Sequence, residues 1–124
     1  MARVALVVDD SMVIRHSVCR FLEERGFAVE SATNGLEALQ ILQSVRPDLI
    51  ITDLNMPKMT GSELITALKQ SAETAAIPVV VVAGRGSSDV DQEKRARFVI
   101  YKDIDIDTQL ERAITTLIEP PGND

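Results

Sequence analysis

The chain has 124 residues, of which 45% are hydrophobic and 26% charged, the ordinary balance of one soluble globular domain. Its net charge of −6 argues against nucleic acid and anionic membranes as direct partners, because both reward a basic surface. The single cysteine excludes an intramolecular disulfide framework, and no apolar run approaches the roughly 18 residues of a membrane span. The short apolar run at the start meets Asp9 and Asp10 at once, so we expect no signal peptide and a cytoplasmic location.

Short runs rich in Val and Ile alternate along the chain with longer stretches in which apolar residues recur three or four positions apart. The short runs predict five strands, at Val4–Val8, 28–31, 49–52, 79–82 and Phe98–Tyr101. Four of these runs are almost continuously apolar, as in strands that are covered on both faces. The run 28–31 is more polar, so we expect it at an edge of the sheet.

The intervening stretches carry apolar stripes that predict helices. The second stripe consists of Ala38, Ile41, Leu42 and Val45. The residues expected to cap helices are Ser11 and Gly26 around the first helix, and Asp105 or Asp107 before the last. The stretch 87–97 is polar throughout and gives the weakest prediction of a helix. Residues 119–124 are expected to form a flexible tail or the stub of a linker.

Strands that alternate with helices at this spacing indicate βα units and a parallel sheet with helices on both faces. In such sheets, ligands bind beyond the carboxyl ends of the strands. Asp9 and Asp10 follow the first predicted strand, Asp53 follows the third, and Lys102 follows the fifth. We therefore expect three carboxylates and one ammonium group to converge at one edge of the sheet.

This convergence of charges has a chemical interpretation. Clustered carboxylates repel one another, and Mg²⁺, which takes oxygen ligands, offsets that repulsion. Lysine is a compact positive charge that suits a phosphoryl oxygen. The pattern thus favours phosphoryl transfer onto Asp53, with Asp9 and Asp10 as a pair that holds the metal. Each residue alone is more typical of a turn, a helix cap or a solvated surface, so the prediction depends on their coincidence.

The same residues resemble those of bacterial response-regulator receiver domains. Asp9-Asp10-Ser11 is similar to the acidic pair of that family, Ile51 to Gly61 to the segment around its phosphoacceptor, and Tyr101-Lys102 to its fifth-strand lysine. The resemblance covers residues 3–118. It implies a doubly wound, flavodoxin-like α/β fold, whose five parallel strands take the order 2-1-3-4-5.

The resemblance also implies a role for each site residue. Asp53 would accept a phosphoryl group from a sensor histidine kinase or a phosphotransfer protein, and the domain would catalyse only its own phosphorylation and dephosphorylation. The groups implied to hold Mg²⁺ are the side chains of Asp9, Asp10 and Asp53 and the backbone carbonyl of Asn55. The groups implied to surround the phosphoryl oxygens are the Lys102 side chain and the backbone at Asn55, Ala83 and Gly84.

Three positions depart from the family's pattern. Ala83 stands where the family has Ser or Thr, so a charge-assisted hydrogen bond worth about 1.5–3 kcal/mol is missing. Val99 stands where the family often has an aromatic residue whose rotamer follows phosphorylation. Asp103 replaces the usual proline after Lys102, so we expect a trans peptide there. The domain is therefore either a working phosphoacceptor with an unusual output, or a degenerate receiver that acts as a phosphorylation-independent interaction module.

Other functional classes fit the sequence less well. Phosphohydrolases of the haloacid-dehalogenase type usually place a second Asp two residues after the nucleophile, where this chain has Asn55, which cannot act as a general acid. No Gly-rich loop follows the first strand to hold a nucleotide. A DNA-binding regulator needs a second, basic domain. His16 lies off the apolar stripe of its helix and is expected to be solvated, whereas Cys19 is expected to be partly buried.

Overall fold

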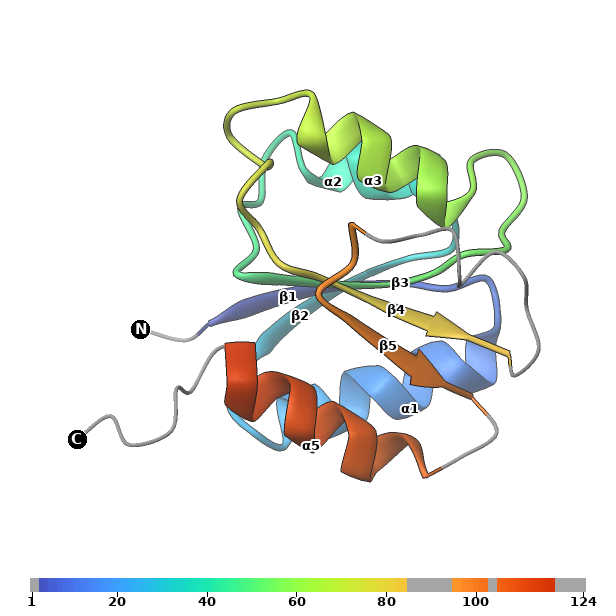
Figure 1. Ribbon diagram of the computed structural model, residues 1–124, viewed down its shortest axis with the longest axis vertical. Coiled ribbons are helices and arrows are strands. Elements are labelled where there is room, and N and C mark those ends of the chain that lie inside the picture. Colours follow the sequence, from blue (N-terminus) through green and yellow to red (C-terminus); the bar gives the residue numbers. More distant parts are fainter. Residues whose placement is uncertain (1–2, 85–94, 103–104, 118–124) are drawn as a thin grey trace.

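The computed structural model describes residues 3–84, 95–102 and 105–117 (Figure 1). The elements in chain order are β1 (Val4–Val8), α1 (Met12–Glu23), β2 (Ala28–Ala32), α2 (Gly35–Ile41), β3 (Leu49–Asp53), α3 (Gly61–Lys69), β4 (Val79–Ala83), β5 (Phe98–Tyr101) and α5 (Ile106–Leu117). Within the described residues the strands pair in parallel, in the order β2-β1-β3-β4-β5. This order confirms the predicted flavodoxin-like fold.

The sheet lies between two helical layers, with α1 and α5 on one face and α2 and α3 on the other (Figure 1). Successive residues of a strand point to opposite faces. In β1, Ala5 and Val7 therefore pack with the cluster under α1 and α5, while Leu6 and Val8 pack with the cluster under α2 and α3. A strand covered on both faces needs an apolar side chain at every position, which is why the central runs are continuous.

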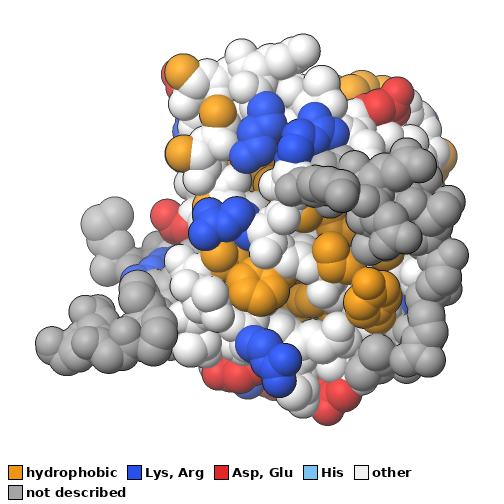
Figure 2. Space-filling view, in the orientation of Figure 1, with side chains coloured by type: hydrophobic (Ala, Val, Ile, Leu, Met, Phe, Trp, Pro, Cys, Tyr) orange, Lys and Arg blue, Asp and Glu red, His pale blue; other side chains and the backbone are white. Residues whose placement is uncertain are grey.

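The two edge strands differ from the central ones in their exposure. β2 lies at one edge, as its polar sequence predicts, and its Glu30 and Ser31 are exposed. β5 lies at the other edge, and Figure 2 shows apolar side chains gathered on that face of the molecule. Val99 and Tyr101 pack toward α2 and α3, whereas Phe98 packs toward α1 and α5. The side chains of β5 therefore alternate between the two faces of the sheet.

Helix ends are marked by the residues that the sequence indicates. The Ser11 hydroxyl accepts a hydrogen bond from the Ile14 N–H at 3.3 Å and so caps α1. Gly26 follows that helix with a φ of +89°, in the left-handed region that glycine adopts without strain. Of the two candidates before α5, Asp105 is the cap, because its carboxylate accepts from the Thr108 N–H at 3.3 Å.

Three predicted strand ends were one residue short. β2 extends to Ala32, β3 to Asp53 and β4 to Ala83. The ladder continues because Asp53 still pairs with Val82, and Ala83 still pairs with Tyr101. Asp53 is therefore the last residue of its strand rather than the first residue after it, and the sheet itself holds its backbone.

The predicted extent of the second helix was wrong. α2 ends at Ile41, so Val45 lies outside the helix. The Gln43 N–H donates to the Gln40 carbonyl, and the Ser44 N–H donates to the Ile41 carbonyl. These three-residue spacings tighten the chain after the last α-helical turn. The apolar stripe continues to Val45, one turn beyond Ile41, but this spacing alone does not extend the helix.

Some predictions fall outside the described residues. They are most of the helix predicted within 87–97, the peptide bond between Lys102 and Asp103, and the tail 119–124. Residues 95–97, which are described, are not helical. None of the helices in the described ranges is long and apolar enough to span a bilayer.

Candidate functional site

The carboxyl ends of β1 and β3 lie side by side, because Val8 pairs with Thr52 in the sheet. Asp9 and Asp10 leave β1 at this point, and Asp53 ends β3. One carboxylate oxygen from each of the three residues lies within 4.8 Å of the others. The parallel register thus brings together the three acids that the sequence pattern singled out.

Asp53 is buried, and each of its carboxylate oxygens has a different neighbour. Oδ1 accepts hydrogen bonds from the N–H groups of Leu54 at 2.8 Å and Asn55 at 3.4 Å. Oδ2 lies 3.1 Å from the Lys102 ammonium nitrogen. The start of the β3–α3 loop and the end of β5 therefore hold this carboxylate in one orientation.

Asp9 is also buried, at 2% exposure. Its Oδ1 accepts from the Ser11 N–H at 2.9 Å, and its Oδ2 lies 3.5 Å from Lys102 Nζ. Burial raises the pKa of Asp9; the Ser11 hydrogen bond opposes this, and the nearby charge of Asp53 adds to it. Asp10, by contrast, is exposed. The cluster therefore combines two buried acids with one that faces solvent.

Lys102 reaches the acids from the end of β5, which lies two strands away from β3 in the sheet. Its backbone N–H donates to the Ala83 carbonyl at 2.9 Å, which extends the β4–β5 pairing by one residue. Burial lowers the pKa of Lys102, but the hydrogen bond with Asp53 and the charges of Asp53 and Asp9 outweigh it, so its pKa lies above the ordinary value. The ammonium group is thus charged at neutral pH and offsets two of the carboxylates.

The remaining predicted site residues are Asn55, which follows Asp53 by two positions, and Ala83 and Gly84 at the end of β4. Asn55 is exposed beside Asp53, and Gly84 is exposed at the end of β4. Ala83 is buried, and its methyl group packs with the core under α2 and α3. The Ala83 side chain brings no polar atom to the site.

The β3–α3 loop closes tightly over the end of β3. The Gly61 N–H donates to the Leu54 carbonyl at 2.8 Å. A Cβ at Gly61 would collide with the Asp53 carbonyl and lie 2.8 Å from the Leu54 Cα. Only glycine fits this close approach.

Two neighbours of the acids were missed by the sequence analysis. Arg15 donates through Nη1 to the Asp9 carbonyl at 2.7 Å. The Thr52 hydroxyl, which is buried, donates to the Asp53 carbonyl at 2.8 Å. A hydroxyl within an otherwise apolar strand was the available signal for Thr52. Arg15 had no such signal, because a basic residue on an exposed helix is common.

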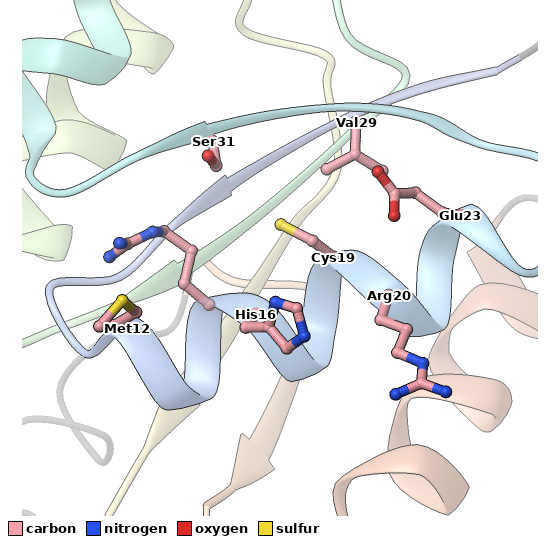
Figure 3. Close-up of a pocket in the computed structure, with 8 residues that line it drawn as sticks. Met12, His16, Cys19, Arg20, Glu23, Val29 and Ser31 are labelled. Carbon is pink, nitrogen blue, oxygen red and sulfur yellow. The ribbon is translucent and has the colours of Figure 1, made fainter.

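A groove of about 610 Å³ lies apart from the acidic cluster, between α1 and β2 (Figure 3). His16 and Cys19 are among the residues that line it. His16 is exposed and Cys19 is half-buried, as predicted. Burial raises the pKa of the Cys19 thiol, so the thiol stays protonated at neutral pH. No acid of the cluster lines this groove.

The donor set of the acidic cluster fits a hard divalent cation. Mg²⁺ prefers oxygen ligands and typically takes one or two carboxylates while it keeps several waters. The oxygens of Asp9, Asp10 and Asp53 lie close enough together to share one ion, and the exposure of Asp10 leaves room for water.

A five-stranded parallel sheet in this order, with acids after β1, an acid ending β3 and a lysine after β5, defines the receiver class of signalling domain. The family model of the response regulator receiver domain matches residues 5–114, and the chain belongs to this family. It is a receiver domain of two-component signalling, a family characterised by phosphorylation and Mg²⁺. Receiver domains are signalling domains rather than classical enzymes.

Relatives of known sequence support the same assignment. The chain is 38% identical over 82 residues to the response regulator MprA of Mycobacterium ulcerans (strain Agy99), a match that covers 66% of this chain and 34% of MprA. The matched part also spans 35% of the related MprA of Mycobacterium avium (strain 104). The match thus spans about a third of the length of these curated relatives.

Solved structures share the whole fold. A receiver domain of a signal transduction histidine kinase from Syntrophus aciditrophicus has a TM-score of 0.86 at 31% identity, covering 99% of this chain and 95% of that one. The chemotaxis response regulator CheY4 of Vibrio cholerae has a TM-score of 0.84 at 33% identity, covering 94% of this chain and all of CheY4. The receiver domain of the sensor histidine kinase PA1611 from Pseudomonas aeruginosa PAO1 has the same fold, with a TM-score of 0.86 at 17% identity. The match covers 96% of this chain and 99% of that one. The PA1611 structure holds a magnesium ion in the active site cleft.

Proposed function

We propose that Asp53 accepts a phosphoryl group from a phosphohistidine of a sensor histidine kinase or phosphotransfer protein, in a Mg²⁺-dependent reaction. The observation that carries this proposal is the Asp53 carboxylate itself. One of its oxygens is held by the Leu54 and Asn55 N–H groups, and the other by Lys102. Two further carboxylates lie within reach of the same metal ion.

In the transfer step, a carboxylate oxygen of Asp53 attacks phosphorus while the phosphorus–nitrogen bond of the donor breaks. The donor imidazole leaves with the electron pair, and Asp53 becomes an acyl phosphate. Asp9, Asp10, Asp53 and the Asn55 carbonyl would hold Mg²⁺, which would supply positive charge for the phosphoryl oxygens. Lys102 offsets the same negative charge, and its contact with Asp53 places it beside the reacting group. Hydrolysis of the acyl phosphate by water then resets the domain.

The backbone N–H groups of Asn55 and Gly84 complete the surroundings of the phosphoryl group. Ala83 adds no hydroxyl donor there, and Val99 lacks a ring that could swing between two positions. These two residues favour a second candidate function, in which the domain binds a partner whether or not Asp53 is phosphorylated. The retained acids and lysine favour phosphorylation over this alternative.

The receiver domain, on this proposal, occupies residues 3–118, and 119–124 form a tail or linker stub. The protein acts in the cytoplasm, where histidine kinases present their phosphohistidine. Its partners are the phosphodonor and an output protein or domain, and its acidic surface makes direct contact with nucleic acid or membrane unfavourable.

Intact-protein mass spectrometry after incubation with acetyl phosphate tests the proposal. We expect one added phosphoryl group in the wild-type protein with Mg²⁺, and none in Asp53→Asn or when Mg²⁺ is removed with EDTA. Asp107→Asn, which removes an exposed carboxylate on α5 that is not one of the three clustered acids, is the matched control and should be modified like the wild type. An unmodified wild-type protein, under conditions that phosphorylate another receiver, would contradict the proposal and favour the phosphorylation-independent alternative.

A further inference from the structure

The β3–α3 loop is packed against the beginning of α2 at one glycine. Gly35, the first residue of α2, is buried, and its N–H donates to the Met59 carbonyl at 3.4 Å. A Cβ at Gly35 would lie 2.7 Å from Met59 Cγ, 2.8 Å from its Sδ and 2.9 Å from its Cβ. Carbon atoms in ordinary contact stand about 3.5–4.0 Å apart. The Met59 side chain therefore occupies the space that any other residue at position 35 would need.

This contact involves the loop backbone and not only a flexible side chain. The end of a methionine can swing away, because three rotatable bonds precede its methyl group. The Cβ of Met59 cannot, because it is bonded directly to the backbone. Relief of a contact at 2.9 Å from that atom therefore requires the loop itself to move away from α2.

The loop is also fixed at its other contacts. Its far end is held against the Leu54 carbonyl by the Gly61 N–H, with no free space at Gly61. Just before Met59 the chain makes a tight turn, in which the Met59 N–H donates to the Pro57 carbonyl at 2.7 Å and Lys58 has a φ of +69°. This is the strained γ-turn geometry that persists only when its surroundings impose it.

A displacement at Met59 is therefore passed back toward Asn55. Only four residues separate Leu54, which the Gly61 contact holds in place, from Met59. One of these residues, Met56, is buried in the core. The Leu54 N–H bond to Asp53 Oδ1 is 2.8 Å long, whereas that of Asn55 is 3.4 Å. Because the longer bond is the weaker one, the backbone of Asn55 is the part of the site that responds first.

We propose that Gly35 and Met59 form a positioning pair, whose contact sets the distance of the β3–α3 loop from α2 and thereby the place of the Asn55 backbone relative to the Asp53 carboxylate. Neither residue touches the reacting groups. Their effect on chemistry rests on the proposed function, since the Asn55 carbonyl and N–H are the groups that they place beside the metal and the phosphoryl oxygens. Figure 1 shows α2 and α3, the helix that follows Met59 in the chain, on the same face of the sheet.

The test compares Gly35→Ala, Met59→Gly and the double variant with the wild-type protein. In Gly35→Ala, we expect the Asn55 amide resonance of the Mg²⁺-free protein to move. We also expect Mg²⁺ affinity and the rate of phosphorylation by acetyl phosphate to fall about fivefold to tenfold, where tenfold corresponds to about 1.4 kcal/mol. Met59→Gly removes the Met59 Cβ together with the rest of the obstacle, so the double variant should return to within about twofold of Met59→Gly alone.

Circular dichroism and thermal unfolding separate positioning from loss of fold. Gln40→Ala changes an exposed residue of α2 that has no part in the contact, and it is the control for helix propensity. It should leave the Asn55 amide resonance, the Mg²⁺ affinity and the phosphorylation rate unchanged. If Gly35→Ala does not fold, Met59→Gly still tests the inference, because removal of the whole Met59 side chain, Cβ included, should shift the Asn55 amide. A folded Gly35→Ala with wild-type Asn55 shifts and Mg²⁺ affinity overturns the inference, as do effects that simply add in the double variant.

Failure of the proposed function would look different. In that case the wild-type protein itself would neither bind Mg²⁺ nor become phosphorylated. The Asn55 resonance of the Mg²⁺-free variants would still report whether the contact places the loop.

Discussion

Asp9 and Asp53 carry the same charge at neighbouring strand ends, but they are held by different groups. Asp9 is oriented by the Ser11 N–H and anchored through its carbonyl by Arg15. Asp53 is oriented by the two N–H groups that follow it and by Lys102. These contacts fix both carboxylates before any ligand arrives, so little reorganisation is needed on binding.

Cys19 offers a test of burial at a single residue. Because burial raises the pKa of its thiol above the ordinary value of 9.0, the reactive thiolate is scarcer than in an unfolded chain at the same pH. We expect reaction with iodoacetamide at pH 8 to be slower in the folded protein than in urea, with the folded rate still rising as the pH passes 9. Equal rates in the folded and unfolded protein would contradict the assigned burial.

Gly61 and Gly84 both lie beyond the carboxyl ends of the strands, and they differ in the space that an added Cβ would find. A Cβ at Gly61 would collide with the backbone of Asp53 and Leu54, whereas a Cβ at Gly84 would meet nothing within 4 Å. We expect Gly61→Ala to lower the free energy of unfolding by about 1–3 kcal/mol, the usual cost of forced overpacking, and Gly84→Ala to change it little. Urea denaturation of the two variants measures the difference. Similar losses would show that the close approach at Gly61 is not what limits the loop.

At the scale of elements, side-chain caps set where each helix begins. Ser11, Asn34 and Thr60 each accept from a backbone N–H in the first turn of α1, α2 and α3, and Thr60 forms a complete capping box with Glu63. These caps satisfy donors that the helix itself leaves unpaired. The caps therefore fix where the β1–α1, β2–α2 and β3–α3 loops end at the carboxyl ends of the strands.

The Asp105 cap of α5 predicts a pH-dependent contribution to stability. Hydrogen bonds from the Thr108 hydroxyl and N–H lower the pKa of Asp105 below its ordinary value of 3.8. A carboxyl with a lowered folded-state pKa contributes stability that is complete above its unfolded pKa and is lost as the pH falls through the folded value. Asp105→Ala should therefore lower the free energy of unfolding at pH 7, and by less as the pH falls below about 4.

Urea denaturation at pH 7 and at pH 3 checks this prediction. Thr116→Ala, an exposed change near the other end of α5, is the control and should show the same small effect at both values. A penalty for Asp105→Ala that is equal at the two pH values would mean that its charge has no part in the cap.

The site also bears on the stability of the whole molecule. Three carboxylates at one edge repel one another, and Lys102 offsets only part of their charge. Because Mg²⁺ binds the folded arrangement and not the dispersed acids of the unfolded chain, it should raise the unfolding temperature. The gain is about 2.7 kcal/mol at a concentration 100 times the dissociation constant.

Thermal unfolding with and without MgCl₂ measures this effect, with NaCl at matched ionic strength as the control. Asp10→Asn removes the exposed acid and should reduce the gain. An unfolding temperature that responds equally to both salts would show that the acids hold no Mg²⁺.

Much of the fold follows from local pattern. The alternation of continuous apolar runs with helical stripes predicted every strand and the sheet type, because the period of apolar residues reflects which faces are buried. Strand ends and the end of α2 were less accurate. Sheet pairing carried Asp53 and Ala83 into the strands, and tight turns ended the helix before Val45. Such ends depend on neighbours distant in sequence, which a local pattern does not contain.

The sequence by itself determined which charged residues stand at the ends of the strands, and so the chemical character of the site and its family. Only the tertiary structure decided how they meet: Asp53 within 3.1 Å of Lys102, Asp9 buried and Asp10 exposed, and Met59 seated on Gly35. The reason is physical. Residue type and spacing encode secondary structure and burial, whereas contacts between residues tens of positions apart depend on sheet register and on the path of each loop.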